Sequence, residues 1–158
     1  MAVDYFWKLD GIKGESVDSN HKDWIQLMSF SWGATQVTTV AGTGGSGAGK
    51  ADLSDFSIMK HLDKASTPLL KALVSGSHIK TGNLEAVKAG AGGKPFLKAD
   101  FKELFVTSIQ HSATDEIPRE SVSFSYNEIK VEYSQQNDQG IVTTTGAVTY
   151  NVKENKVS

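Results

Sequence analysis

The sequence predicts a mainly β protein: an antiparallel β-barrel with one short α-helix and a long glycine-rich hairpin loop. Three observations lead to this fold class. Apolar and polar residues alternate with a period of two along most of the chain, as in half-buried strands. A single segment carries both helix start and helix stop signals. Glycines gather between residues 41 and 50. At 158 residues the chain is long enough to bury about two-thirds of its unfolded surface, so we expect one domain spanning residues 1–158.

The first two expected strands lie in residues 3–9 and 24–32. In the first, one face carries Val3, Tyr5, Trp7 and Leu9. In the second, one face carries Trp24, Met28, Phe30 and Trp32, and the other carries Ile25, Leu27, Ser29 and Ser31. The three tryptophans all lie on these apolar faces, which favours a place in the core or in a subunit interface over a sugar-stacking platform.

Longer strands are expected in the second half of the chain. From residue 96 to 109 the odd positions are apolar: Leu97, Ala99, Phe101, Phe105 and Ile109. In residues 121–133 the apolar positions change from even to odd numbers, which predicts a β-bulge near Asn127 and Glu128. Bulges bend strands, and bending helps a sheet to close into a barrel. A last strand is expected over residues 142–152.

The helix is expected to follow Thr67, which suits the N-cap. Pro68 suits the first helical position, and Gly76 suits the residue after the end. Between them an apolar stripe is formed by Leu69, Leu70, Leu73 and Val74. Because a helix of about two turns does not persist alone in water, the stripe should be buried against the barrel.

The glycine-rich loop mimics a phosphate-binding loop. Gly44, Gly49 and Lys50 fit the spacing G-x-x-x-x-G-K, and the spacing G-x-G-x-x-G is also present. Both motifs need a helix directly afterwards, yet the residues after Lys50 alternate like a strand, so we expect a flexible hairpin tip. The loop could order only against a neighbouring subunit. Its candidate contact residues are Gly42, Gly44, Gly45, Gly47 and Gly49.

Composition and spacing argue against several classes of function. The absence of cysteine removes disulfides, thiolate metal sites and cysteine nucleophiles. A net charge of -2 without a basic cluster argues against nucleic-acid binding. The four histidines show no spacing that would seat a metal, and no G-x-S-x-G elbow is present. We therefore expect no enzyme, no metal and no cofactor.

The chain also lacks an apolar run long enough to span a bilayer or to act as a signal peptide. We expect no membrane insertion, synthesis in the cytoplasm, and any export by a route that needs no cleaved signal. Ser29 and Ser31 form a small polar row opposite Phe30 and Trp32. This row suits a wetted inner wall that meets a passenger protein, although exposed strand serines are common.

Two sequence blocks resemble one protein family. The first contains the run Asp10-Gly-Ile-Lys-Gly-Glu-Ser, the single His21 and the closing residues Ser29-Phe-Ser-Trp-Gly33. The second runs from Asp55 to Leu70 and is similar to the segment that leads into the one helix of these proteins. Together, in this order and separated by a glycine-rich loop, the blocks resemble the Hcp family, the tube-forming proteins of bacterial type VI secretion systems.

The resemblance implies a homohexameric ring that stacks into a tube. A contractile sheath would propel the tube, together with its tip (spike) proteins, out of the cell, with effectors carried in the lumen. Within the chain, the glycine-rich loop, the first strand and the C-terminal tail are candidates for the contacts between subunits. Two alternatives remain open at this point: a monomeric barrel that binds a small molecule in an apolar cavity, and an enzyme evolved on the same scaffold.

Overall fold

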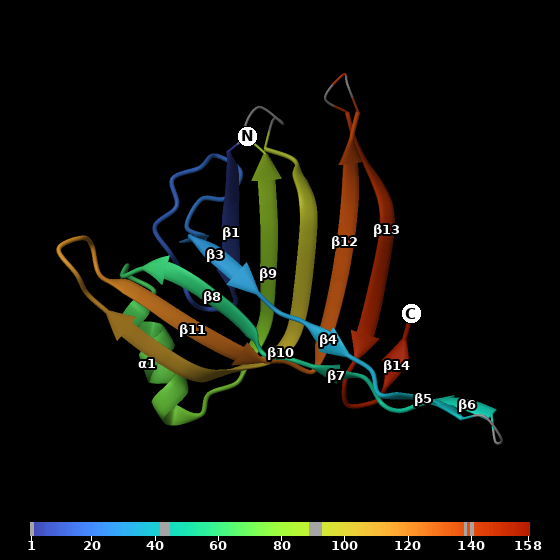
Figure 1. Ribbon diagram of the computed structural model, residues 1–158. Helices are drawn as coiled ribbons and strands as arrows, with labels where there is room; N and C mark the ends of the chain where they lie inside the picture. The colour runs from blue at the N-terminus through green and yellow to red at the C-terminus, as the bar shows by residue number, and fades with distance from the viewer. Residues whose placement is uncertain (1, 42–44, 89–92, 138, 140) are drawn as a thin grey trace.

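The computed structural model describes residues 2–41, 45–88, 93–137, 139 and 141–158. It contains one α-helix, α1 (Ser66–Ser75), among the described residues, and the remaining elements are strands (Figure 1). The strands are β1 (Val3–Leu9), β2 (Ile25–Leu27), β3 (Ser29–Ser31), β4 (Ala34–Thr35), β5 (Thr38–Ala41), β6 (Gly45–Ala48), β7 (Asp52–Leu53), β8 (Phe56–His61), β9 (Ile79–Lys88), β10 (Pro95–Ser112), β11 (Arg119–Ser125), β12 (Glu128–Gln136), β13 (Val142–Asn151) and β14 (Lys156–Val157).

Two antiparallel sheets share the long strand β10. The first, here called the back sheet, has the order β2–β1–β9–β10–β12–β13–β14. The second, the front sheet, has the order β3–β8–β11–β10. In Figure 1 the front sheet lies before β1 and β9, and β12 and β13 extend to one side of the barrel as a wing.

β10 passes from one sheet to the other at a bend. Glu103 has a φ of 55°, a left-handed conformation that is rare for a side chain other than glycine. The alternation therefore reverses there: Phe101 is buried, but the next buried residues are Leu104 and Val106. The expected long strand is present as β10, but Phe105 does not share the buried face of Phe101, and its side chain is 41% exposed.

The strands that pair with β10 also change at this bend. β11 pairs with residues 105–112 of β10 and β12 pairs with residues 97–102, so the two lie along the same edge of β10. Between them, Tyr126 and Asn127 lie outside the strands. The predicted β-bulge near Asn127 and Glu128 is therefore wrong, because the change of parity falls at a break between β11 and β12.

The segment expected as one strand over residues 24–32 is also divided, and that prediction is wrong. A bend at Met28 separates β2, which pairs with β1, from β3, which pairs with β8. Ile25 and Leu27 are buried before the bend, whereas Phe30 packs on the core after it. At this bend the Met28 N–H donates to the Met59 carbonyl at 2.7 Å, which ties the end of β2 to β8.

Aromatic rings fill the interior between the sheets. Trp7, Phe56, Phe101 and Phe124 are 0–1% exposed. The Trp7 ring lies 4.7 Å from Phe56 and 5.5 Å from Phe124, centroid to centroid, which are distances typical of favourable aromatic pairs. The barrel is therefore a packed core and not a hollow container.

The helix begins two residues earlier than expected. Ser66 is its first residue and Thr67 is exposed within it, so Thr67 is not the N-cap. Gly76 has a φ of 64° and ends the helix as expected. Leu69 and Ala72 are buried, but Leu70 and Val74 are 44% and 75% exposed, which corrects the expectation that the whole stripe is buried.

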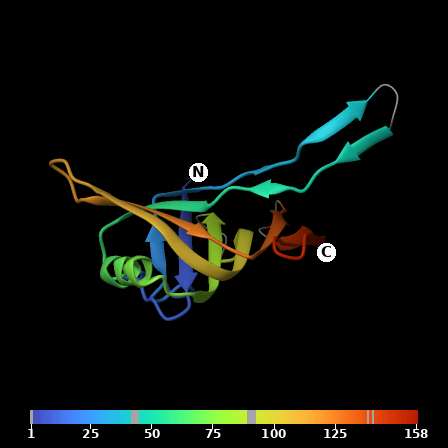
Figure 2. The same cartoon turned by 90° about the horizontal axis from the view of Figure 1, so that it is seen from below.

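Residues 34–53 form a narrow two-stranded arm that projects from the barrel (Figure 2). β4 pairs with β7, and β5 pairs with β6 further out. Lys50 is followed by β7 and not by a helix, so the arm lacks the N-terminal helix amides that hold a phosphate.

Candidate assembly surfaces

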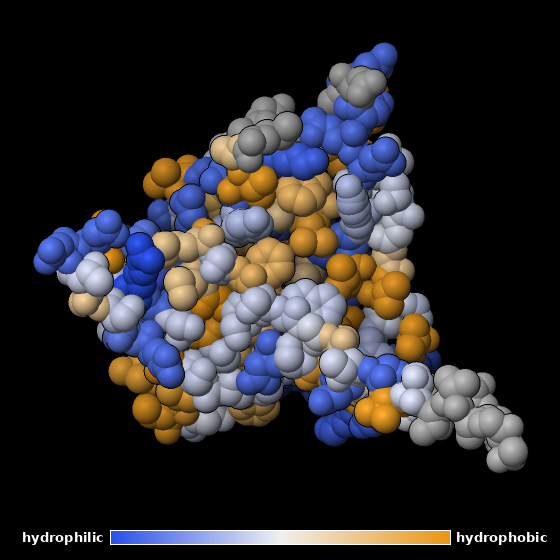
Figure 3. Space-filling view, in the orientation of Figure 1, coloured by the Kyte–Doolittle hydropathy of each residue, from blue (hydrophilic) through white to orange (hydrophobic). Residues whose placement is uncertain are grey.

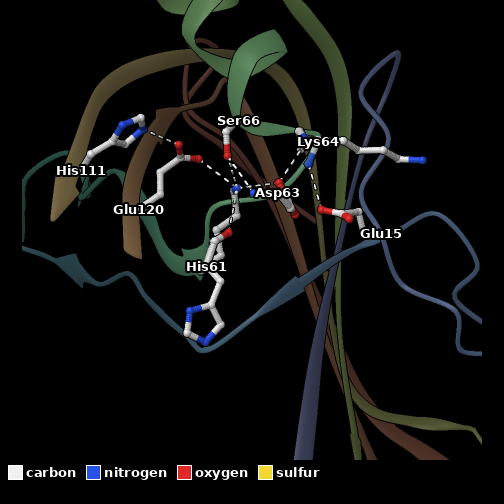
Figure 4. Close-up of polar contacts among 9 residues, drawn as sticks. Glu15, His61, Asp63, Lys64, Ser66, His111 and Glu120 are labelled. Carbon is white, nitrogen blue, oxygen red and sulfur yellow. Dashed lines mark hydrogen bonds and ion pairs between the residues drawn. The ribbon is translucent and has the colours of Figure 1, made fainter. Parts of the chain in front are cut away.

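A buried charged cluster lies at one end of the barrel, beside the start of α1 (Figure 4). Lys60 of β8 and Glu120 of β11 are both fully buried, and Lys60 Nζ lies 3.0 Å from Glu120 Oε1. Lys60 Nζ also donates to Asp63 Oδ1 at 2.8 Å, to Ser66 Oγ at 3.1 Å and to the His61 carbonyl at 3.3 Å. An ammonium group has three N–H donors, so the acceptors around Lys60 Nζ are sufficient to satisfy all of them.

The cluster joins four parts of the fold. His111 of β10 contacts Glu120 Oε2 through Nε2 at 2.6 Å. Asp63 Oδ1 accepts the Ala65 N–H at 2.9 Å, and Ser66 Oγ accepts the Asp63 N–H at 3.1 Å. Lys60 therefore links β8 and β11 to the first turn of α1, so the role of this buried cluster is structural.

A second polar cluster fixes the turn between β1 and β2. His21 is 1% exposed and bridges Asp18 Oδ2 at 2.7 Å and Glu85 Oε1 at 2.9 Å, while its ring stacks on Phe6 at 4.1 Å. The hydrogen bond from His21 lowers the pKa of Asp18 below its ordinary value of 3.8. His21 thus orients the polar turn.

The outward face of the front sheet is rich in hydroxyl groups. Ser31, Ser57, Ser123 and Ser108 stand opposite one another in a row across β3, β8, β11 and β10. Ser57 Oγ and Ser123 Oγ lie 2.9 Å apart. The adjacent row holds Ser29, Met59, Ser121 and Gln110. Neither of these two rows contains an ionisable side chain, whereas the next row on the same face holds His61 and Arg119. The two serines singled out in the sequence therefore belong to an uncharged part of this face.

The front sheet has two edges without a strand partner in the described part of the chain. β3 pairs with β8 only. Residues 105–112 of β10 pair with β11 on one side, and β9 reaches only as far as Leu104 on the other. Unpaired edges offer backbone donors and acceptors to another chain.

The arm is anchored to the barrel where the two sheets meet. Tyr126 donates from its hydroxyl to the Ser54 carbonyl at 2.9 Å, and Thr107 Oγ1 donates to Asp55 Oδ2 at 2.7 Å. Burial, reinforced by the negative charge of Asp55, raises the pKa of Tyr126 to about 12. The base of the arm is thus fixed by specific contacts.

The predicted loop residues are distributed along this arm. Gly45 and Gly47 lie in β6, and the Gly49 N–H donates to the Val37 carbonyl at 2.9 Å. Gly42 and Gly44 lie outside the described residues. The contacts of this arm with another subunit stay a prediction.

Several features of these surfaces were missed in the sequence, although a signal was present. Lys60 occupies the inward position after Phe56 and Ile58, and Glu120 precedes Val122 and Phe124 in the same way. Strand parity alone therefore places both charges in the core. The outward serines of β8 and β11 follow from the same parity.

The surface hollows do not favour a small-molecule site. One hollow of about 520 Å³ lies beside the β10 bend and is lined by Lys80, Lys102, Glu103 and Glu128 among others. Charges of both signs line it, whereas ligand pockets are mostly apolar with a few polar groups.

The fold and these surfaces define a class of protein: a packed antiparallel β-barrel with one helix, a projecting arm and unpaired sheet edges. The comparisons with known proteins identify the family. A sequence profile described as "Type VI secretion system effector, Hcp" matches residues 6–133. "Protein hcp1" of Pseudomonas aeruginosa is 34% identical over 160 residues, covering 98% of each chain. The chain belongs to the Hcp family of type VI secretion tube proteins.

Solved structures support this assignment. One described as "Structure of a type six secretion system protein" has a TM-score of 0.93 and 33% identity, covering 99% of this chain and 100% of the other. Hcp1 from Salmonella typhimurium has a TM-score of 0.80 and 31% identity over the same shares. The cap of an anti-feeding prophage shares only the fold, at 11% identity and a TM-score of 0.54 over 82% of this chain and 87% of that one.

The family is one of secreted structural proteins, which favours the tube function over the alternative of a ligand-binding barrel. Within the described residues, no helix has the length and apolar character needed to cross a membrane.

Proposed function

We propose that this protein forms a closed homohexameric ring, and that rings stack into the exported inner tube of a type VI secretion system. The observation that supports the ring is the pair of unpaired edges on the front sheet. A head-to-tail contact joins two different surfaces of identical subunits, and it closes into a ring when the rotation allows.

Edge-to-edge pairing of neighbouring copies is also consistent with the directions in which the strands run. All neighbours in the front sheet are antiparallel, and the sheet has four strands. Because four is even, β3 of one copy and β10 of the next also run antiparallel. The front sheets of successive copies can therefore continue as one sheet around the ring.

This arrangement gives the hydroxyl-rich wall a role. The inward face of the front sheet packs on the core, so the outward face lines the lumen. Ser29 and Ser31 are the proposed contacts for effectors carried there. The two uncharged rows suit transport, because they form no strong ion pairs with the cargo.

The arm is the proposed contact between stacked rings. It extends away from the barrel (Figure 2), and its glycines Gly42, Gly44, Gly45, Gly47 and Gly49 allow it to adapt to a neighbouring ring. The tube would meet the contractile sheath on its outside and spike proteins at its tip. Assembly is proposed to take place in the cytoplasm, and export without a cleaved signal peptide.

Light scattering on the purified protein tests the ring directly. We expect a mass of about six times the 17.0 kDa of the chain, and ring-shaped particles in negative-stain images. A monomer at all accessible concentrations would contradict the proposal and would favour the monomeric barrel.

A further inference from the structure

Two exposed apolar patches lie on opposite flanks of the barrel. The first, here called the helix ridge, consists of Leu70 and Val74 of α1, which are 44% and 75% exposed. The second, the wing face, consists of Leu97 of β10, Val131 and Tyr133 of β12, and Val148 of β13. Figure 1 shows α1 on one side and β12 and β13 on the other.

The wing face is continuous with the core. Phe101, Ile129 and Tyr150 stand in one cross-strand row, and all three are buried. The next row holds Ala99, Val131 and Val148, and the one after it holds Leu97 and Tyr133. The two outer rows are more exposed than the first, with Val148 at 56% and Tyr133 at 46%, because no other element of the described chain covers the outer part of the wing.

The opposite face of the wing is different in character. It carries Lys98, Asp100, Lys130 and Glu132, which are charged side chains suited to water. A strand pair with one charged and one apolar face is built to bury the apolar one. Figure 3 shows orange side chains gathered in the hollow between the front sheet and the wing.

The helix ridge is also left uncovered by the described residues of its own chain. Leu69 and Ala72 point into the core, which places Leu70 and Val74, four residues apart, together on the outer side. Exposed single apolar residues are common, but two patches of this kind on one small domain call for a partner.

From these observations we propose that the helix ridge of one copy packs on the wing face of the next copy. The inference rests on the proposed ring, and it places a second contact beside the paired sheet edges. α1 packs against β10, and His78, three residues after the end of α1, meets Phe105 at the unpaired edge of β10 edge-on, with ring centroids 5.5 Å apart, so the end of α1 lies next to that edge. β3, the other unpaired edge, continues into β4, which runs towards the wing in Figure 1.

The occupant is therefore a second copy of this chain. One copy offers the ridge together with the β10 edge, and the next offers the wing face together with the β3 edge. Joining them covers both apolar patches and both unpaired edges at once. The contact joins two different surfaces, so it belongs to a ring and not to a two-fold dimer.

Two single variants test the contact, one on each patch: Val74→Asp and Val148→Asp. Each puts a carboxylate into the proposed apolar interface, where an unpaired charge is costly, and should weaken association at least about 100-fold. The control is Val17→Asp, at a side chain that is 95% exposed in the turn after β1 and outside both patches. Circular dichroism and urea unfolding establish that all three variants fold.

Mixing the two defective variants gives a sharper result. The Val148→Asp copy retains an intact ridge and the Val74→Asp copy retains an intact wing face, so one sound contact can form between them. We expect each variant alone to be monomeric, and the mixture to give a dimer of about twice 17.0 kDa by light scattering. The Val17→Asp control should keep the mass of the wild type.

The outcomes separate this inference from the proposed ring. If the wild type forms rings and folded Val74→Asp or Val148→Asp forms them equally well, the ridge-to-wing contact is wrong and the ring proposal stands. If the two variants are monomeric but their mixture gives no dimer, the pairing of these two patches is wrong. A monomeric wild type would overturn the ring and this contact together.

Discussion

Lys60 shows how a single buried charge holds several elements together. Its ammonium is fully buried and faces both Asp63 and Glu120, two carboxylates whose own exposure is 13% and 0%. Taking charges out of water is expensive, and the cost is offset only while every partner is present. The ion pairs of Lys60 are therefore required for this end of the barrel to fold, but they add little net stability.

Replacing Lys60 with Met should lower the free energy of unfolding by about 3–5 kcal/mol, because Glu120 and Asp63 would remain buried without their counter-charge. The measurement is urea unfolding followed by circular dichroism. Lys102→Met is the matched control, since Lys102 pairs with Glu128 at 3.2 Å but is 66% exposed, and it should change stability by at most about 1 kcal/mol. The double variant Lys60→Met/Glu120→Leu should recover part of the loss; no recovery would show that the ion pair is not the cause.

Asp18 gives the turn after β1 a defined dependence on pH. Its pKa is lowered in the folded protein, chiefly by the hydrogen bond from His21. A carboxyl with a lowered folded-state pKa contributes stability above its unfolded pKa, and the contribution is lost as the pH falls through the folded value. Stability should thus decline below about pH 4, and Asp18→Asn should reduce this decline. Urea midpoints at pH 6 and pH 3 measure it, and an equal decline in both proteins would contradict the role of Asp18.

At the scale of elements, close packing between β1 and β9 leaves no room for a side chain at Gly82. A Cβ there would lie 2.7 Å from Cη2 and 3.0 Å from Cζ2 of Trp7, and 3.3 Å from Cδ2 of Leu104. Trp7 is completely buried among other rings, so it cannot move aside freely.

Gly82→Ala should therefore lower the free energy of unfolding by about 1–3 kcal/mol, the usual cost of overpacking a core. Thermal unfolding followed by tryptophan fluorescence measures the change. Gly146→Ala in β13 is the control, because a Cβ at that position meets nothing within 4 Å. If both variants unfold at the wild-type temperature, the close contact with Trp7 is not limiting.

The sequence predicted the elements better than their boundaries. Period-two alternation located most strands, and Gly76 located the end of the helix, because these are local signals. The bends at Met28 and Glu103 were missed. Each bend changes which side chains of the strand point inwards, and the backbone conformation responsible cannot be predicted from the type of residue. Whether Leu70 and Val74 are buried depends on what packs against α1, and spacing along the helix carries no such information.

The surfaces were predictable to a smaller degree. Ser29 and Ser31 were recognised as an outward polar row, but the matching serines of β8 and β11 become part of one wall only through strand register. Register between strands distant in sequence is set by the whole fold. The buried charged cluster around Lys60 was missed for the same reason, because β8, β11 and α1 are brought together only by the three-dimensional fold.

At the scale of the whole molecule, the fold separates a rigid barrel from an independent arm. In the outer part of the arm, the described residues of β5 and β6 pair with each other and form no ladder with the barrel. Contacts that a subunit does not use for its own stability are available for assembly. The barrel edges and the arm can therefore serve two different contacts, one within a ring and one between rings.

Removing the outer arm tests this division. Residues 38–48 would be replaced by Asn-Gly, a two-residue turn suited to a short hairpin between Val37 and Gly49. The unfolding free energy of the isolated subunit should change by less than about 1 kcal/mol, because β5 and β6 form no ladder with the barrel and shortening a connection alters its closure entropy only slightly. Rings should still form, since the edges of the front sheet and the wing are intact, but stacks of rings should be lost. Sedimentation velocity and negative-stain imaging distinguish single rings from stacks. Loss of the rings themselves would show that the arm acts between neighbours within a ring, and undiminished stacking would show that the surfaces of the barrel alone join one ring to the next.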